Sequence, residues 1–327
     1  MESIETGVRQ RPHIEKAVAE ILEKKIENIF LVGCGGSLAV MSPLRYIIDI
    51  ESQIPAYEYN SSEFLAVKPC KFSSGSLMIT SSYTGTTKET VAAAEWAREK
   101  GASIIAFVGK LDSPLGRLAD YAFENDAKAG VTDSKLIMLY QILFNIIKKT
   151  DSYQDYDEWM KTMELLPQLL DQVKEAARER AESFAQAYKD ETFFFVTGSG
   201  AGWGEAYSYA NCILEEMQWI YAQPVHSGEF FHGAFEMLTE DSPIIVMQGE
   251  DRTRPLGDRV LEFVSQYTKK IIHVDAKDYE LPEVPEKFRG YLTPIVLSAV
   301  MSIYSERLEA ARNHPLSTRR YMFKVEY

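Results

Sequence analysis

The stretch IFLVGCGGS at residues 29–37 decides the fold, because the chain repeats it as FFFVTGSG at residues 193–200. Two further pairs of segments keep the same spacing: SSEF at 61–64 with SGEF at 227–230, and LMIT at 77–80 with PIIV at 243–246. Gly198 follows Gly33 by 165 residues, and each of the other two pairs is offset by 166 residues. A nearly constant offset across three separate segments predicts a duplicated α/β unit.

Alternating strands and helices account for the rest of each copy. In the first half, runs that are apolar throughout lie at about 28–33, 77–81 and 103–108. Helical stretches near 38–49 and 87–100 separate them, and the second half repeats the apolar runs at about 192–198, 243–248 and 270–275. Such strands, separated by helices, are typical of a parallel sheet covered on both faces. We therefore predict an α/β protein with two doubly wound parallel sheets flanked by helices, one in residues 1–150 and one in residues 151–327.

Length, charge and cysteine content limit the class of protein. The formal net charge of −13 argues against nucleic acid and anionic membranes as partners, because both are bound through clustered Lys and Arg. Three widely spaced cysteines indicate neither a disulfide framework nor a zinc site, and they fit a reducing cytosol. No secretory signal is evident at the N-terminus, and the longest apolar-rich stretch, 291–304, is too short to span a bilayer. We expect a cytoplasmic protein.

A hydroxyl-rich loop, SSYTGTT at residues 81–87, follows a buried strand and opens a helix. The N–H groups at a helix N-terminus suit an anion, and the hydroxyls of Ser82, Thr84 and Thr87 add donors. The loop lacks the lysine of a P-loop, so a single sugar phosphate fits better than a nucleoside triphosphate. A simple Ser/Thr-rich helix cap is the alternative. The second copy has MQGEDR at 247–252 instead, which indicates one functional pocket on a duplicated scaffold.

The glycine-rich segment at residues 33–37 has the spacing G-x-G-G rather than the G-x-G-x-x-G of dinucleotide-binding proteins. We therefore expect no nicotinamide cofactor, and no other cofactor. Gly35 lets the backbone approach a ligand closely, and the Ser37 hydroxyl is a candidate donor.

Acidic and histidine residues gather in the second half at Glu215, Glu216, His226, Glu229 and His232. A carboxylate and an imidazole together suit proton transfer between neighbouring atoms of a substrate. No metal-binding spacing of the HExxH or facial-triad kind occurs, so no metal is expected. The two glutamates could instead form a solvated helix face. On a helix, adjacent residues point about 100° apart, so only one of the pair should face a pocket.

The C-terminal tail begins at His314, and its segment HPLSTRRY at 314–321 is basic in an otherwise acidic protein. Arg319 and Arg320 are candidates to face a carboxylate or a phosphate, and a surface strap is the alternative reading.

Taken together, these motifs resemble the sugar isomerase (SIS) domain family over nearly the whole chain, as two tandem SIS domains. The segment Ser82–Thr87 is similar to the family's S-x-S-G-x-T phosphate loop, with Thr84 in place of the second serine. Ser37 matches a serine that also contacts phosphate. The segment GEFFHG at 228–233 resembles GELKHG of the synthase that makes glucosamine 6-phosphate. The sixteen-residue spacing from Glu216 to His232 is that between the synthase's isomerising glutamate and its ring-opening histidine.

Within the family, the segment GEF at 228–230 and the ending, with RRY at 319–321 and VEY at 325–327, most resemble fructosamine-6-phosphate deglycases. The resemblance implies cleavage of a 6-phosphorylated Amadori compound, such as fructoselysine 6-phosphate, to glucose 6-phosphate and a free amino acid. It implies Glu216 and His232 as catalytic residues, with the histidine acting in a neighbouring subunit's site, and hence a homodimer or larger homo-oligomer. The implied phosphate- and substrate-binding residues are Gly35, Ser37, Ser82, Tyr83, Thr84, Thr87 and Arg320.

Several alternatives stay open at this point. The same residues could serve an aldose–ketose phosphosugar isomerase or an aminosugar-phosphate deaminase, and tandem SIS domains also occur as non-catalytic phosphosugar sensors. The amino-acid half of the substrate is open, as is the choice between an Amadori compound and its carbon-2 amino isomer. The role of Arg320 is open because the synthase has a lysine there, and arginine stays charged rather than donating a proton. No role is assigned to His226.

Overall fold

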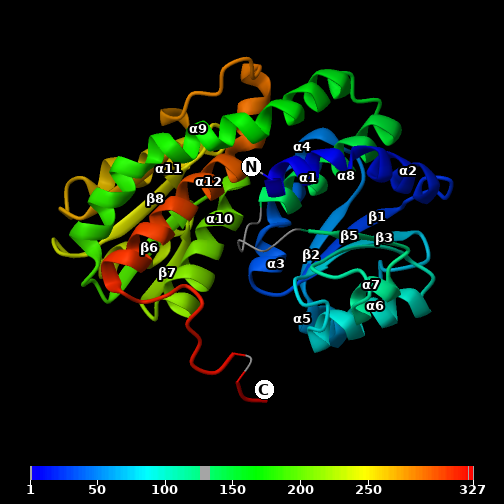
Figure 1. The fold of residues 1–327 in the computed structure, drawn as a ribbon, viewed down its shortest axis with the longest axis horizontal. Helices are drawn as coiled ribbons and strands as arrows, with labels where there is room; N and C mark the ends of the chain where they lie inside the picture. The colour runs from blue at the N-terminus through cyan, green and yellow to red at the C-terminus, as the bar shows by residue number, and fades with distance from the viewer. Residues whose placement is uncertain (1, 126–132, 323, 327) are drawn as a thin grey trace. The chain divides into compact units, whose positions relative to one another are not determined.

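The computed structural model describes residues 2–125, 133–322 and 324–326. The chain divides into two compact units, residues 1–167 and 168–327, which are described separately (Figure 1). The boundary expected after residue 150 stays a prediction. It lies at the end of one helix, α8 (Asp133–Thr150), whereas the two units divide at Pro167, inside the following helix α9 (Tyr156–Tyr188). No helix in the described ranges combines the length and the apolar content needed to cross a membrane.

The first unit is built on a parallel sheet of five strands in the order β2-β1-β3-β4-β5. The strands are β1 (Asn28–Gly33), β2 (Ala56–Asn60), β3 (Ser76–Ser82), β4 (Ser103–Val108) and β5 (Tyr121–Glu124). Besides α8 and the start of α9, its helices are α1 (Glu2–Arg9), α2 (Arg11–Ile21), α3 (Gly36–Ala39), α4 (Ser42–Glu51), α5 (Ser61–Val67), α6 (Lys88–Glu99) and α7 (Pro114–Leu118).

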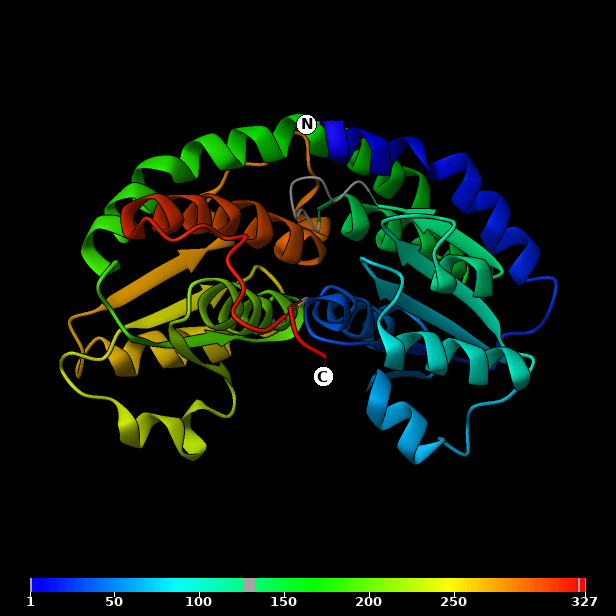
Figure 2. The same cartoon turned by 60° about the horizontal axis from the view of Figure 1, so that its bottom comes forward.

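Both faces of this sheet are buried, as strands apolar throughout require. Phe30, Met78 and Ile104 point to one face and form a hydrophobic core with the alanines of α6. Their neighbours Leu31 and Ile79 point to the opposite face, because side chains alternate along a strand, and they are also fully buried. Figure 2 shows helices on both faces of the sheet. The strands β1 and β3, whose carboxyl ends lead into the loops of the candidate site, are therefore buried on both faces.

The second unit repeats this topology with four parallel strands in the order β7-β6-β8-β9. The strands are β6 (Phe193–Gly198), β7 (Tyr221–His226), β8 (Ile244–Gln248) and β9 (Ile271–Asp275). Besides the greater part of α9, its helices include α10 (Trp203–Ser208), the π-helix η2 (Tyr209–Met217), α11 (Arg254–Val264) and α12 (Glu286–Arg312). Because this order matches β2-β1-β3-β4 strand for strand, the prediction of an α/β protein with two parallel sheets flanked by helices is confirmed.

Three edge strands, β2, β5 and β7, have no counterpart among the predicted strands. Each of them contains partly exposed and exposed residues, so none forms a run that is buried and apolar throughout. The helix expected near 38–49 is two helices, α3 and α4, and Pro43 lies in the first turn of the second. The duplicated segments follow β2 and β7: SSEF forms the start of α5, and SGEF leads into the 3-10 helix η3 (Phe230–His232).

Candidate active site

The carboxyl edge of the first sheet carries both loops that the sequence singled out. Strands β1 and β3 are hydrogen-bonded neighbours in parallel register, so the loops that follow them start side by side. Gly35 caps α3 with a left-handed φ of 52°, a conformation that favours glycine, and Ser37 lies in the first turn of that helix. Ser82 is the last residue of β3. The structure thus places the turn with Gly35 and Ser37 and the loop with Ser82 at one edge of one unit.

The hydroxyl-rich loop, residues 82–87, is ordered by its own side chains. The Ser82 and Thr87 hydroxyls lie 2.8 Å apart, and the Gly85 N–H donates to Ser82 Oγ at 3.1 Å. The Thr86 hydroxyl donates to Thr84 Oγ1 at 2.8 Å, and both Tyr83 and Thr84 are exposed. Thr87 is the N-cap residue of α6 but makes no side-chain hydrogen bond to that helix. Thr87 therefore does not act as a simple helix cap, and its side chain leaves the first-turn N–H groups of α6 uncapped.

In the second unit, a carboxylate stands at the corresponding edge. Asp251 lies in the loop after β8, and Ala201 lies in the loop after β6. The Ala201 N–H donates a hydrogen bond to the Asp251 carboxylate at 3.3 Å. The carboxylate also accepts from the N–H and the hydroxyl of Thr253 at 2.7 and 2.6 Å. An internal anion thus joins the two loops in the unit that lacks the hydroxyl-rich sequence.

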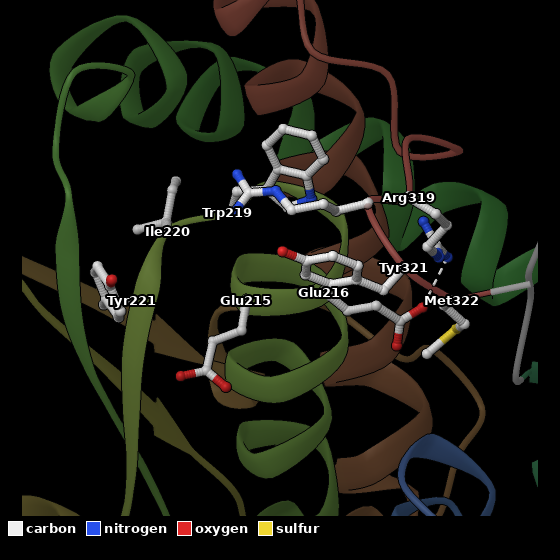
Figure 3. Close-up of a pocket in the computed structure, with 9 residues that line it drawn as sticks. Glu215, Glu216, Trp219, Ile220, Tyr221, Arg319, Tyr321 and Met322 are labelled. Atoms are coloured by element: carbon white, nitrogen blue, oxygen red, sulfur yellow. Dashed lines mark ion pairs between the residues drawn. The ribbon is translucent and has the colours of Figure 1, made fainter. Parts of the chain in front are cut away.

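Glu215 and Glu216 lie near the end of the π-helix η2 rather than on an α-helix. The Gln218 N–H donates to the Ile213 carbonyl at 2.9 Å, the spacing of a π-helix, and such turns are rare and frequent at functional sites. Figure 3 shows the two carboxylates pointing in different directions, Glu216 toward the C-terminal tail and Glu215 away from it. Both nevertheless line one pocket, so the expectation that only one would face it is wrong.

Glu216 is the partly buried member of the pair. Its carboxylate forms an ion pair with Arg319 at 2.8 Å, and the side chains of Glu216 and Arg319 are 22% and 16% exposed. Burial raises the pKa of Glu216 above its ordinary value, and the charge and hydrogen bond of Arg319 oppose that rise. Glu215 is exposed and accepts a hydrogen bond from the Ala222 N–H at 3.3 Å. Glu216 therefore has the environment of a tuned acid–base group.

Arg319 and Arg320 were both candidates to face a carboxylate, but only Arg320 was named as a substrate-binding residue, and it is Arg319 that meets the Glu216 carboxylate. Its Nη1 also donates to the Leu316 and Thr318 carbonyls, both at 2.8 Å, which fixes the guanidinium within the tail. The only sequence signal was the pair of basic residues in an acidic chain, and that signal does not say which arginine meets the carboxylate.

A pocket of about 450 Å³ surrounds the Glu216–Arg319 pair. Its lining comes from the end of η2, the start of β7 and the tail: Glu215, Glu216, Trp219, Ile220, Tyr221, Arg319, Arg320, Tyr321 and Met322 (Figure 3). Trp219 has a left-handed φ of 57°, and its ring packs against the His314 ring at 4.8 Å and under the Arg320 guanidinium at 4.3 Å. The Gln218 amide donates to the His314 carbonyl at 2.7 Å, so the end of η2 holds the start of the tail.

The histidines of the second unit lie outside this pocket. His232 ends η3 and is exposed, and it is not among the residues that line the Glu216 pocket. His226 Nδ1 lies 3.2 Å from the Gly228 N–H, and its ring packs edge-on against Trp203, which fits a structural role in the turn after β7. In the described part of the chain, no three His, Cys, Asp or Glu side chains are grouped as metal ligands would be.

Comparisons with known proteins agree with this architecture. The model of the SIS domain matches residues 21–145. Fructosamine deglycase FrlB of Bacillus subtilis is 38% identical over 317 residues, which cover 96% of this chain and 97% of that protein. Fructoselysine 6-phosphate deglycase of Escherichia coli is 23% identical, with 95% and 89% covered. A solved structure from Bacillus subtilis superimposes with a TM-score of 0.91 at 39% identity and covers 95% of this chain and 97% of its own.

Proposed function

This chain belongs to the SIS-domain family, and on that premise we propose that it is a deglycase acting on 6-phosphorylated fructosamines. The 38% identity to a fructosamine deglycase along nearly the full length of both chains supports the activity. The observation that carries the chemistry is the half-buried carboxylate of Glu216, whose raised pKa suits a proton-transfer group.

In the proposed reaction, Glu216 as a carboxylate takes a proton from carbon 1 of the Amadori compound and leaves an enaminol. A proton then returns to carbon 2, from His232 or through water, which gives a Schiff base between carbon 1 and the amine. Water adds to this bond and releases glucose 6-phosphate and the free amino acid, so one water is consumed and no redox partner is needed. The hydroxyl-rich loop of residues 82–87, with Ser37 and Gly35, binds the phosphate and supplies binding energy remote from the reacting carbons.

The decisive assay is incubation of the purified protein with fructoselysine 6-phosphate, followed by enzymatic detection of glucose 6-phosphate. Glucose 6-phosphate and lysine should appear in equal amounts. Fructose 6-phosphate as the product would point instead to a carbon-2 amino sugar as the substrate. Interconversion of phosphosugars without release of an amine would indicate an isomerase, and binding without turnover would indicate a sensor.

Replacement of Arg319 should move the pH profile of the reaction. Arg319 holds the pKa of Glu216 lower than burial alone would, so its loss should raise that pKa further. Because the base must be deprotonated, the acidic limb of kcat/KM should shift to higher pH in Arg319→Gln and much less in Arg319→Lys, which keeps the charge. An unshifted acidic limb in Arg319→Gln would mean that another group titrates there.

We also propose a cytoplasmic homodimer or larger homo-oligomer in which His232 of one subunit acts beside Glu216 of the next. The exposure of His232 outside the Glu216 pocket of its own chain supports shared sites, and three free cysteines fit a reducing compartment. Phe230 and Phe231 precede His232 and were both candidate interface residues, but Phe230 is fully buried within its own chain, so the partly exposed Phe231 remains the candidate.

Mixing two inactive proteins tests the shared site. After subunit exchange between Glu216→Gln and His232→Ala protomers, half of the dimers are mixed, and each mixed dimer has one intact site, so about a quarter of wild-type activity should return. Native mass spectrometry verifies that exchange has occurred. Exchange without recovery of activity, or a fully active monomer at nanomolar concentration, would contradict the proposal.

A further inference from the structure

Two consecutive arginines in the tail, Arg319 and Arg320, differ in burial and in the groups that they contact. Arg319 is largely buried and bound to Glu216 and to two carbonyls of its own tail. Arg320 is exposed, and among the described residues it forms no ion pair with a carboxylate. It lines the same pocket as Glu216. The pocket therefore contains one guanidinium that is neutralised and one whose charge is available to a ligand.

The Arg320 guanidinium is oriented before any ligand binds. It lies 4.3 Å from the centre of the Trp219 ring. That ring also packs against the His314 ring, which helps to hold it in place. A guanidinium stacked on an aromatic face keeps its N–H edge free, and that planar edge matches the two oxygens of a carboxylate. Glu215 also lines the pocket, but its carboxylate is bonded to the Ala222 N–H. The geometry thus suits an anionic group brought by the substrate.

We propose that Arg320, held by Trp219, binds the carboxylate of the amino-acid half of the substrate. The inference rests on the proposed function, in which Glu216 acts at carbon 1 and the amine is bonded to that same carbon. In a substrate linked through its α-amine, the carboxylate lies close to carbon 1, so a residue that recognises it must line the pocket of the base. Arg320 meets that condition, and it makes the amino-acid half a determinant of specificity.

The test compares two substrates that differ in one charge, fructosylglycine 6-phosphate and fructosylglycinamide 6-phosphate. The wild-type protein should prefer the carboxylate substrate by roughly 10–100-fold in kcat/KM, the usual worth of a hydrogen-bonded charged group. Arg320→Gln should remove this preference by weakening only the carboxylate substrate, and Arg320→Lys should keep part of it. Trp219→Leu should reduce the preference as well, because the guanidinium loses its platform.

Arg319→Gln is the matched control, since it alters the neighbouring arginine and should slow both substrates by the same factor. Arg320 is exposed, so its variants should keep the wild-type melting temperature. Equal loss for both substrates in Arg320→Gln would overturn the proposal, because the residue would then bind the phosphate or another shared part. Equal turnover of both substrates by the wild-type protein would also overturn it while leaving the deglycase function intact. Turnover of neither, while fructoselysine 6-phosphate is cleaved, would overturn only this proposal, and turnover of none of the three would refute the deglycase function too.

Discussion

Glu216→Gln is expected to lower kcat by roughly 10²–10⁴, the usual contribution of a positioned acid–base group. Glutamine keeps the size and the hydrogen-bonding shape of the side chain, so the pocket and the tail should stay in place, but it cannot accept the proton from carbon 1. KM should change little, because the proposed phosphate anchor is untouched. Steady-state kinetics with a 6-phosphorylated fructosamine measure both quantities, and glucose 6-phosphate release reports the rate.

The matched control is Glu215→Gln, one residue earlier on the same π-helix. Glu215 also lines the pocket, but it is exposed and has no ion pair with Arg319, so its loss should lower kcat far less. The reverse ranking, with Glu215→Gln inactive and Glu216→Gln active, would show that the sixteen-residue spacing to His232 identifies the wrong carboxylate. The mechanism would then have to be reassigned on this helix.

The double variant Ser82→Ala with Thr84→Val should raise KM strongly. Each lost hydrogen bond to a charged phosphate costs about 1.5–3 kcal/mol, so the pair together should raise KM by roughly 10²–10⁴. The effect on kcat should be smaller, because neither hydroxyl is proposed to contact the reacting carbons. Initial rates over a wide range of substrate concentration separate the two parameters.

A substrate without phosphate controls for damage to the loop itself. Ser82 also accepts a hydrogen bond from the Gly85 N–H, so its removal could disturb the turn. If the hydroxyls bind phosphate, the double variant should lose the wild-type preference for fructoselysine 6-phosphate over unphosphorylated fructoselysine. If instead both substrates weaken alike, or if the double variant binds the phosphorylated substrate as well as the wild type does, the phosphate anchor lies elsewhere.

The central strands could be predicted because burial on both faces leaves an unbroken apolar run. β1, β3 and β4 are such strands, and their predicted bounds differ from the observed ones by no more than a residue. The edge strands β2, β5 and β7 have no such run, and short segments without one are hard to distinguish from loops. The duplication supplied what local patterns could not, because it aligned the segments that follow β2 and β7.

The candidate site was only partly accessible to sequence reasoning. Loop residues such as Ser82 and Thr87 follow directly from their place between a strand and a helix. The contact between Glu216 and Arg319 joins segments far apart in the chain, and no local pattern indicates which of two adjacent arginines makes it. The π-helix that carries Glu216 also leaves no distinct periodicity in nine residues. These features depend on tertiary packing.

Asp251 gives the two halves of the molecule different dependences on their surroundings. In the second unit the anion is part of the chain, so it occupies its place at a fixed effective concentration whatever the metabolic state. In the first unit the proposed anion comes from solution, and its stabilising effect grows with the logarithm of ligand concentration. The concentration of phosphorylated substrate would thus affect the stability of the first unit, while the stability of the second unit would not depend on it.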